Sequence, residues 1–399
     1  MNIWIVSIFD TTRFDNTRPM RSEGIANSLL ERGHKVTYIS SNFRHSTKKY
    51  RTLVSNTIQN EENLKTIYLK TLSYSRNISF KRFYSHFAYA LELRKFLKQK
   101  NDKPDVIVSA LPPIFLNFIL ARWCKENSVK YYVDIIDPWP DVFLKFVPKK
   151  INYLAKYIFS PYKLFLRNIL KNSSGYLAIS NEYISWANSI RPNSNSYCCY
   201  PAIDTQAYHE MIEAYKIKKS KSVLNVVYAG SLGASYDIPT ILKAAEILHS
   251  KFPEKIKFHI AGAGQYQSQI EQYIQNHTNL KFYGRLNYSD LLKLYAECHV
   301  GLSQYREGAT QSVTYKLFDY LGAGLPIINS LQSEMKSIIE VEKVGKNNLP
   351  GDYNGLANHI IEFLEVDTLL EMQKNATEVA NKFGNIKTVY TSFIDNLNS

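Results

Sequence analysis

The stretch that decides the fold lies at residues 315–328 and reads YKLFDYLGAGLPII. Lys316 and Asp319 stand three residues apart, so a helix places both side chains on one face. The lysine can meet a diphosphate as a point charge, and the aspartate can accept hydrogen bonds from ribose hydroxyls. Gly324 and Pro326 then end the helix and start an apolar strand. The pattern favours a nucleotide-sugar site; the alternative is a surface ion pair on an amphipathic helix.

Apolar runs and helical patterns alternate on both sides of this stretch, which is typical of parallel sheets with helices on both faces. The sequence therefore predicts an α/β protein of two Rossmann-like, doubly wound domains that face each other across a cleft. In open parallel sheets the ligand site lies beyond the carboxyl ends of the strands. The predicted strands are residues 3–9, 35–39, 106–109, 130–136 and 175–179 in the first half and 225–230, 257–261, 280–283, 300–303 and 326–329 in the second.

The chain has 399 residues, too many for one ordinary core. Residues 1–205 are predicted to form the first domain and residues 223–379 the second, with a lysine-rich linker at 206–222. A final helix, at about 380–399, is expected to pack back on the first domain.

Composition points to a folded protein with an anionic partner. Hydrophobic residues make up 45% and charged residues 21% of the chain, and the formal net charge is +14. The four cysteines form neither a disulfide framework nor a zinc pattern, which fits a reducing cytoplasm. No apolar run reaches the roughly 18 residues of a membrane span. We expect a cytoplasmic protein, either soluble or peripheral at the inner face of the cell membrane.

Two stretches, residues 74–100 and 143–171, interleave basic with aromatic residues at helical spacing. Such segments suit the headgroup region of an anionic bilayer. The alternative is that the aromatic residues are ordinary core and the charges a solvated face. Nucleic-acid binding is disfavoured, because none of the zinc-finger, RNP or basic-zipper signatures is present.

Glycine-containing turns and strand ends recur in a fixed order along the chain. The segments that carry this pattern are residues 21–26 with 33–36, 104–109 with 112–113, 134–140, 228–233, 260–264, 283–285 and 316–326. In this order and spacing the sequence resembles the retaining glycosyltransferases of GT-B architecture in sequence family 4. The resemblance is strongest with the branch that assembles bacterial surface polysaccharides of the capsule or O-antigen type, and it covers nearly the whole chain.

The resemblance implies that the second domain binds the nucleotide sugar. The loop at 230–233 follows a strand and precedes a helix, so its backbone amides can hold phosphate. The alternative there is a tight strand-to-helix turn. Nucleobase contacts are implied for Gly284 and Arg285. The predicted donor-binding residues are Gly230, Ser231, Gly233, Gly262, Gly284, Arg285, Arg306, Gln311, Tyr315, Lys316 and Asp319.

The sequence departs from the family pattern at three places. The family usually carries two glutamates with seven residues between them, and these positions are Gln311 and Asp319 here. The usual lysine after the first strand of the second domain is replaced by Ser235 and Tyr236, and the usual glycine pair of the first domain by residues 16–19. Lys316, with Arg21 or Arg18, is then expected to carry the diphosphate charge.

The first domain is expected to bind the acceptor. Asp137 begins an Asp-Pro-Trp-Pro element at a strand end, similar to an element of the same family branch. We predict that Asp137 is catalytic, together with Lys316 and Arg21, and that Arg18, Asp137 and Trp139 bind the acceptor. Trp139 would stack on a sugar. The alternative for Asp137 is a turn aspartate before proline.

The predicted reaction moves a sugar from a uridine diphosphate sugar to a hydroxyl of a lipid-linked or growing glycan. The anomeric configuration of the sugar is retained. No cofactor is predicted, and the absence of an Asp-x-Asp signature implies no metal. Two alternatives remain at this stage: a nucleotide-sugar epimerase of the same architecture, and a non-catalytic partner subunit, which Gln311 makes plausible.

Overall fold

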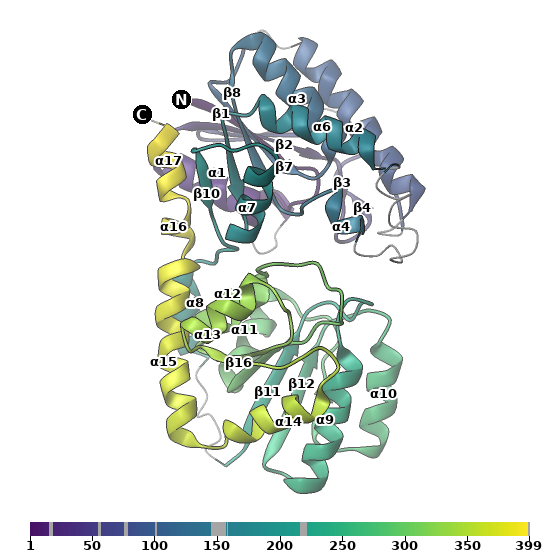
Figure 1. The fold of residues 1–399 in the computed structure, drawn as a ribbon, viewed down its shortest axis with the longest axis vertical. Coiled ribbons are helices and arrows are strands. Elements are labelled where there is room, and N and C mark those ends of the chain that lie inside the picture. The colour runs from purple at the N-terminus through teal and green to yellow at the C-terminus, as the bar shows by residue number, and fades with distance from the viewer. Residues whose placement is uncertain are drawn as a thin grey trace. The chain divides into compact units, whose positions relative to one another are not determined.

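A computed structural model describes residues 1–15, 19–54, 57–75, 79–99, 102–144, 157, 159–215 and 222–397. The chain divides into two compact units. The first contains Met1–Cys199 and Tyr390–Ser399, and the second contains Tyr200–Val389. Each unit is built on a parallel sheet with helices packed against it (Figure 1).

The first unit has a sheet in the order β10-β9-β8-β7-β1-β2-β6-β5, parallel except for β5. A short hairpin, β3 and β4, lies apart from it. The strands are β1 (Asn2–Val6), β2 (Lys35–Ser41), β3 (Phe43–Arg44), β4 (Lys49–Tyr50), β5 (Thr57–Glu61), β6 (Leu64–Leu69), β7 (Val106–Leu111), β8 (Lys130–Ile135), β9 (Gly175–Ala178) and β10 (Ser196–Cys198). The described helices are α1 (Arg21–Glu31), α2 (Phe80–Gln99), α3 (Ile114–Asn127), α4 (Asp141–Leu144), α6 (Ser160–Lys171), α7 (Asn181–Ile190) and α17 (Thr391–Leu397), with a short 3-10 turn at Arg13–Asp15.

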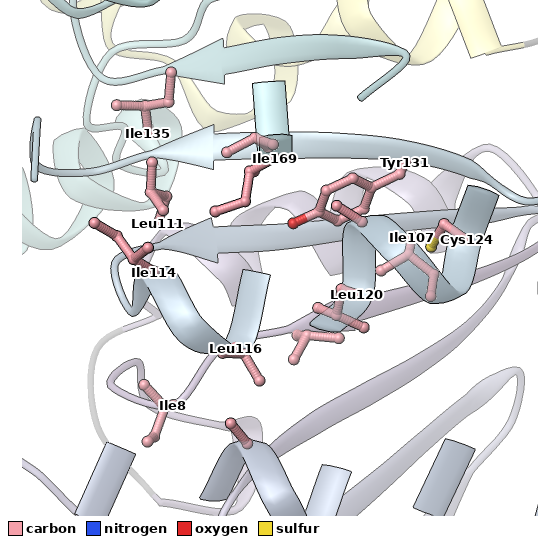
Figure 2. Close-up of a cluster of buried hydrophobic side chains, with 14 of the residues drawn as sticks. Ile8, Ile107, Leu111, Ile114, Leu116, Leu120, Cys124, Tyr131, Ile135 and Ile169 are labelled. Carbon is pink, nitrogen blue, oxygen red and sulfur yellow. The ribbon is translucent and has the colours of Figure 1, made fainter. Parts of the chain in front are cut away.

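The core of the first unit forms because its central parallel strands are buried along nearly their whole length, so that side chains on both faces of the sheet are covered. Helices α2, α3 and α6 cover one face (Figure 1). Figure 2 shows this packing, with Leu111 and Ile135 of the sheet beside Ile114 and Leu120 of α3 and Ile169 of α6.

The second unit has a sheet in the order β13-β12-β11-β14-β15-β16, with every strand parallel. Its strands are β11 (Leu224–Ala229), β12 (Ile256–Ala261), β13 (Leu280–Phe282), β14 (Val300–Ser303), β15 (Ile327–Asn329) and β16 (Gly345–Asn347). Its helices are α8 (Thr205–Ala214), α9 (Ile238–Lys251), α10 (Gln267–Asn276), α11 (Tyr288–Glu297), α12 (Tyr315–Gly322), α13 (Glu334–Val341), α14 (Tyr353–Glu362), α15 (Val366–Phe383) and α16 (Ile386–Val389). The order of strands reverses at β11, which makes the carboxyl end of this strand the topological switch point.

The sequence predicted the fold class and all ten of its strands correctly. It missed six further strands of the described chain: β3 and β4, which form the hairpin, and β5, β6, β10 and β16. Most of these are short, and β16 reads Gly-Lys-Asn, without the apolar run that marked the others. Such strands are held by pairing with a neighbour, which single-sequence periodicity does not register.

The domain boundaries differ from those expected. Residues 205–214 are not linker but helix α8, which belongs to the second unit because its buried face packs in that unit's core. At the other end, α15 and α16 also stay with the second unit, and only the chain from Tyr390 onward joins the first. Most of the expected linker, residues 216–221, lies outside the described part of the chain.

Candidate functional site

Lys316 is the charged centre of the second unit. It lies in the first turn of α12, and its ammonium donates a hydrogen bond to the Ala229 carbonyl at 2.8 Å, at the carboxyl end of β11. The nitrogen also lies 5.0 Å from the ring centres of Tyr228 and Tyr236. Burial lowers the pKa of Lys316 to about 8, with Asp319 opposing the shift. A partly desolvated cation therefore occupies the switch point of the sheet.

The loop after β11 is shaped for close approach of a ligand. Gly230 has φ +146°, and a Cβ there would lie 2.0 Å from the Lys316 ammonium. Gly262, at the end of β12, has φ +152°, and a Cβ there would lie 1.8 Å from the Gly230 carbonyl oxygen. Only glycine fits at these two positions, because the backbone conformation and the space both exclude a side chain.

The amides of this loop are divided between the protein and a possible ligand. Gly230 and Leu232 donate their N–H groups to the carbonyls of Ala261 and Ala263. The described residues supply no acceptor for the amides of Ser231 and Gly233. The predicted phosphate contact by the Gly230 amide is therefore wrong, and the two neighbouring amides are the donors that remain.

A pocket of about 280 Å³ opens beside this loop. The Gly262 amide donates to the Gly284 carbonyl at 2.7 Å, which holds the ends of β12 and the segment after β13 together. Arg285, for which a nucleobase contact is predicted, lines the pocket, whereas Arg306 does not. The pocket is lined by Ala229, Gly230, Ser231, Ala261, Gly262, Ala263, Arg285, Leu286 and Leu291.

Arg306 lies on the exposed loop that follows β14. Its guanidinium carbon is 5.3 Å from the centre of the Tyr266 ring, and its amide donates to the Ser235 carbonyl at 3.0 Å. The residue thus joins two loops at the same end of the sheet as the pocket.

Gln311 and Asp319 stand at the two positions where the resemblance leads us to expect glutamates. The Oε1 atom of Gln311 is buried, and the described residues offer it no hydrogen-bond partner. Asp319 is buried and accepts a hydrogen bond from the Tyr208 hydroxyl at 3.3 Å. The hydrogen bond from Tyr208 reaches the Oδ1 atom of Asp319, and no pattern in the sequence predicted this neighbour. Tyr315 begins α12 beside them and is partly buried.

In the first unit, Asp137 follows β8 in an environment that perturbs its carboxyl group. Burial raises the pKa of Asp137 to about 6, although the positive charge of Arg82 on α2 acts in the opposite direction. Its amide donates to the Leu111 carbonyl at 3.3 Å, which fixes the turn after the strand. A partly buried carboxylate with a pKa near neutrality is a candidate acid or base. Arg82 is a neighbour that the sequence did not predict for this site.

Arg21 has a structural role, so its predicted phosphate or acceptor contact is wrong. Its guanidinium donates to both carboxylate oxygens of Asp134, with distances of 2.6–2.9 Å, and to the Cys199 carbonyl. Both side chains of the ion pair are almost fully buried, at 3% and 2% exposed. The helix start does carry an anion next to this arginine, but the anion is the protein's own Asp134.

Trp139 does not present a free ring face to a sugar. Only 9% of the residue is exposed. Arg82 lies over its ring at 5.9 Å, and the rings of Phe143 and Phe83 pack against it at 4.7 and 6.1 Å. The predicted stacking platform is therefore replaced by a packed aromatic cluster. Arg18, the remaining predicted acceptor residue, lies outside the described part of the chain.

Residues 224–366 match the family model described as glycosyl transferases group 1. The second unit is that of a glycosyltransferase. The matched segment begins at β11 and contains the switch-point lysine, the glycine loop and the pocket. Among curated proteins, no sequence matches significantly.

Solved structures resemble both units of this glycosyltransferase. A sucrose-phosphate synthase from Thermosynechococcus elongatus aligns with a TM-score of 0.74 and 12% identity, over 100% of this chain and 98% of that one. HepE from Anabaena, solved with UDP-glucose, aligns with a TM-score of 0.65 and 13% identity, over 100% of this chain and 99% of that one. WaaG, a glycosyltransferase involved in lipopolysaccharide biosynthesis, aligns with a TM-score of 0.65 and 14% identity, over 98% of each chain. At such identities the likeness establishes the GT-B fold.

Neither a metal-binding group nor a membrane-spanning helix is found among the described residues. No three His, Cys, Asp or Glu side chains among them come together as a group that could hold a metal ion. No helix in the described part of the chain is long and apolar enough to cross a membrane.

Proposed function

We propose that this glycosyltransferase is a retaining hexosyltransferase that moves a sugar from a uridine diphosphate donor to a hydroxyl of a lipid-linked or growing glycan in surface polysaccharide synthesis. The observation that carries the donor half is the ammonium of Lys316 at the end of β11, where the loop that carries the Ser231 and Gly233 amides begins. A cation and N–H donors at a switch point are suited to a diphosphate. The UDP complexes of HepE and the pathway of WaaG support the choice of donor and product class.

The chemistry follows from where charge develops. When the bond from the anomeric carbon to the diphosphate breaks, the leaving oxygen gains negative charge, which Lys316 and the amides of Ser231 and Gly233 stabilise. Asp137 orients the acceptor hydroxyl, and a leaving-group oxygen takes the hydroxyl proton as the new bond forms on the same face. The products are the glycoside and the nucleoside diphosphate. In this proposal protein groups carry the charge, without a metal.

The part of the proposal that concerns the acceptor is supported by the surface of the first unit. On helix α2, Phe80 is 94% exposed and Tyr84 is 65% exposed, and the basic residues Lys81 and Arg94 lie on the same helix. On α6, Leu164 is 65% exposed. Exposed apolar side chains amid cations suit an anionic membrane surface, where a lipid-linked acceptor would be found. We therefore place the enzyme at the cytoplasmic face of the membrane.

The test is a panel of nucleotide sugars screened by thermal shift, with release of nucleoside diphosphate measured in the presence of a membrane-lipid extract. A shift with one donor, and diphosphate release that requires the extract, would support the proposal and name the donor. An epimerase would convert the sugar nucleotide without releasing diphosphate. A protein that binds no nucleotide would contradict the donor site and favour a partner-subunit role.

The pH dependence of kcat/KM is expected to be bell-shaped, with limbs near pH 6 and pH 8. The acid limb arises because Asp137, whose raised pKa is about 6, must be ionised. The alkaline limb arises because Lys316, whose lowered pKa is about 8, must be protonated. Affinity for the intact nucleotide sugar, whose diphosphate is esterified at both ends and does not titrate in this range, should show the alkaline limb and lack the acid one when measured by calorimetry. An acid limb in binding of the nucleotide sugar would contradict the assignment to Asp137.

Replacing Gly262 with alanine is expected to weaken UDP binding at least about 10-fold, because displacement of a site by even 1 Å is costly. The new Cβ would approach the Gly230 carbonyl to 1.8 Å and push the loop away from Lys316. Gly351→Ala is the matched control: it also has a positive φ, +80°, but nothing lies within 4 Å of the added Cβ. Equal UDP affinities for the two variants would show that the loop does not contact the donor.

A further inference from the structure

The first unit contains an apolar pocket of about 480 Å³ that the donor chemistry does not use. It lies among α2, the start of α3 and α6, and its volume is in the usual range of ligand sites, about 300–1,000 Å³. Several of its walls are large apolar side chains that the fold leaves exposed, such as Phe83 at 43% and Phe87 at 42%. The lining residues are Phe80, Phe83, Tyr84, His86, Phe87, Pro113, Ile114, Phe115, Trp139, Tyr162 and Phe165.

A cation lies against two of the walls of this pocket. His86 and Trp139 line the pocket and also contact Arg82: the Arg82 Nε lies 3.4 Å from His86 Nε2, and its guanidinium carbon lies 5.9 Å from the Trp139 ring centre. Lys48 is a second cation that interacts electrostatically with Arg82, and its ammonium lies 4.7 Å from the Tyr74 ring centre.

These two cations are partly desolvated and repel each other. Burial and the charge of Arg82 lower the pKa of Lys48 to about 8, and burial lowers the pKa of Arg82. Asp137 is the carboxylate whose charge acts on Arg82. A bound anion with two negative charges would relieve the repulsion, because opposite charges favour the protonated forms of both side chains.

We propose that this pocket binds the hydrocarbon chain of a lipid phosphate acceptor, with the phosphate at Arg82 and Lys48 and the attached sugar at Asp137. The proposal deepens the proposed function and rests on it. Charge complementarity selects this occupant, since an apolar pocket whose walls His86 and Trp139 contact the Arg82 guanidinium matches an amphiphile with an anionic head. Contact with a bilayer surface would bury protruding aromatic side chains but would not require a hollow bordered by a cation.

The test measures binding of farnesyl phosphate, below the concentration at which it aggregates, by calorimetry. Wild-type protein is expected to bind it at least 10-fold more tightly than either farnesol or methyl phosphate. Phe87→Asp places a charge in the pocket wall and is expected to weaken binding at least 10-fold. Leu91→Asp is the matched control. Leu91 is an apolar residue on the same helix, is 37% exposed and does not line the pocket. Melting temperatures of both variants verify folding.

The variant Arg82→Gln distinguishes binding of the phosphate group from binding of the hydrocarbon chain. It is expected to weaken farnesyl phosphate binding while leaving farnesol binding unchanged. Equal affinities of the wild type and Phe87→Asp for farnesyl phosphate would overturn the proposal. So would binding only to phosphatidylcholine–phosphatidylglycerol vesicles and not to the free amphiphile, which would assign the aromatic surface to the bilayer. UDP binding is measured in parallel, so that loss of the donor function is recognised separately.

Discussion

Replacing Lys316 with methionine is expected to lower nucleoside diphosphate release at least about 100-fold, the usual effect of removing one donor to a developing negative charge. Methionine keeps much of the length of the apolar stem but cannot meet a diphosphate. UDP affinity should fall as well, because the same ammonium contacts the ground state. The measurements are diphosphate release with the donor found by thermal shift and calorimetric titration with UDP.

The same variant is expected to fold normally, with a melting temperature within about 4 °C of the wild type. Loss of the hydrogen bond to the Ala229 carbonyl costs about 1 kcal/mol, but removal of a desolvated charge offsets it. The lowered pKa of Lys316 gives a further signature. Between pH 8 and pH 10.5 the unfolded state holds more protons at this group than the folded state, so this group makes the wild type more stable as pH rises. That contribution is absent from the variant.

Lys336→Met is the matched control for Lys316→Met. Lys336 lies on α13 in the same unit, is 40% exposed and interacts with Glu340 at 4.0 Å, so its loss should change neither turnover nor UDP affinity. Turnover by Lys316→Met at the wild-type rate would refute the donor-site assignment. The partner-subunit alternative would then gain support.

Replacing Arg21 with methionine is expected to destabilise the protein by about 3–5 kcal/mol, because it leaves the buried Asp134 carboxylate without its partner. For a unit of about 200 residues this corresponds to a fall in melting temperature of roughly 6–20 °C. The lost hydrogen bond to the Cys199 carbonyl adds to the effect, since it fixes the end of the first unit's main segment. Thermal denaturation, followed by circular dichroism, measures it.

A double variant distinguishes the buried charge from general disruption. Arg21→Met with Asp134→Leu removes both charges, so it should be more stable than Arg21→Met alone. Arg32→Met is the control: its pair with Asp395 is 44% and 55% exposed and should contribute at most about 1 kcal/mol. A wild-type melting temperature for Arg21→Met, together with lost transfer, would restore the phosphate-binding role predicted from the sequence.

The contrast between these two residues shows how far local reasoning reaches. For Lys316, the spacing in one helix and the glycine turn after it were enough to predict its position at the carboxyl edge of the sheet. A helix that leads into a strand of a parallel sheet begins at that edge. For Arg21, the first residue of α1, a position at the positive end of a helix favours a neighbouring anion. The sequence could not identify that anion as Asp134, because the two lie far apart in the chain and meet only through the pairing of β1, β7 and β8.

Trp139 and Asp137 show the same limit within one short segment. The Asp-Pro-Trp-Pro element located a turn at the end of β8, but exposure of each side chain depended on α2. Phe83 packs on Trp139, and Arg82 covers its ring and acts on Asp137. Neither contact has a local signal, since α2 and this turn are separated by two strands and a helix.

By itself the sequence determined two Rossmann-like domains, the positions of ten strands and the glycine loop with its lysine, because these follow from periodicity and turn chemistry between near neighbours. Tertiary structure alone decided which charges are paired inside the protein and which are left for a ligand. It joined Arg21 to Asp134, placed Tyr208 on Asp319, and put Arg82 beside Asp137. The physical reason is that burial and partnership of a charge are set by side chains distant in sequence, and these determine its pKa and its availability.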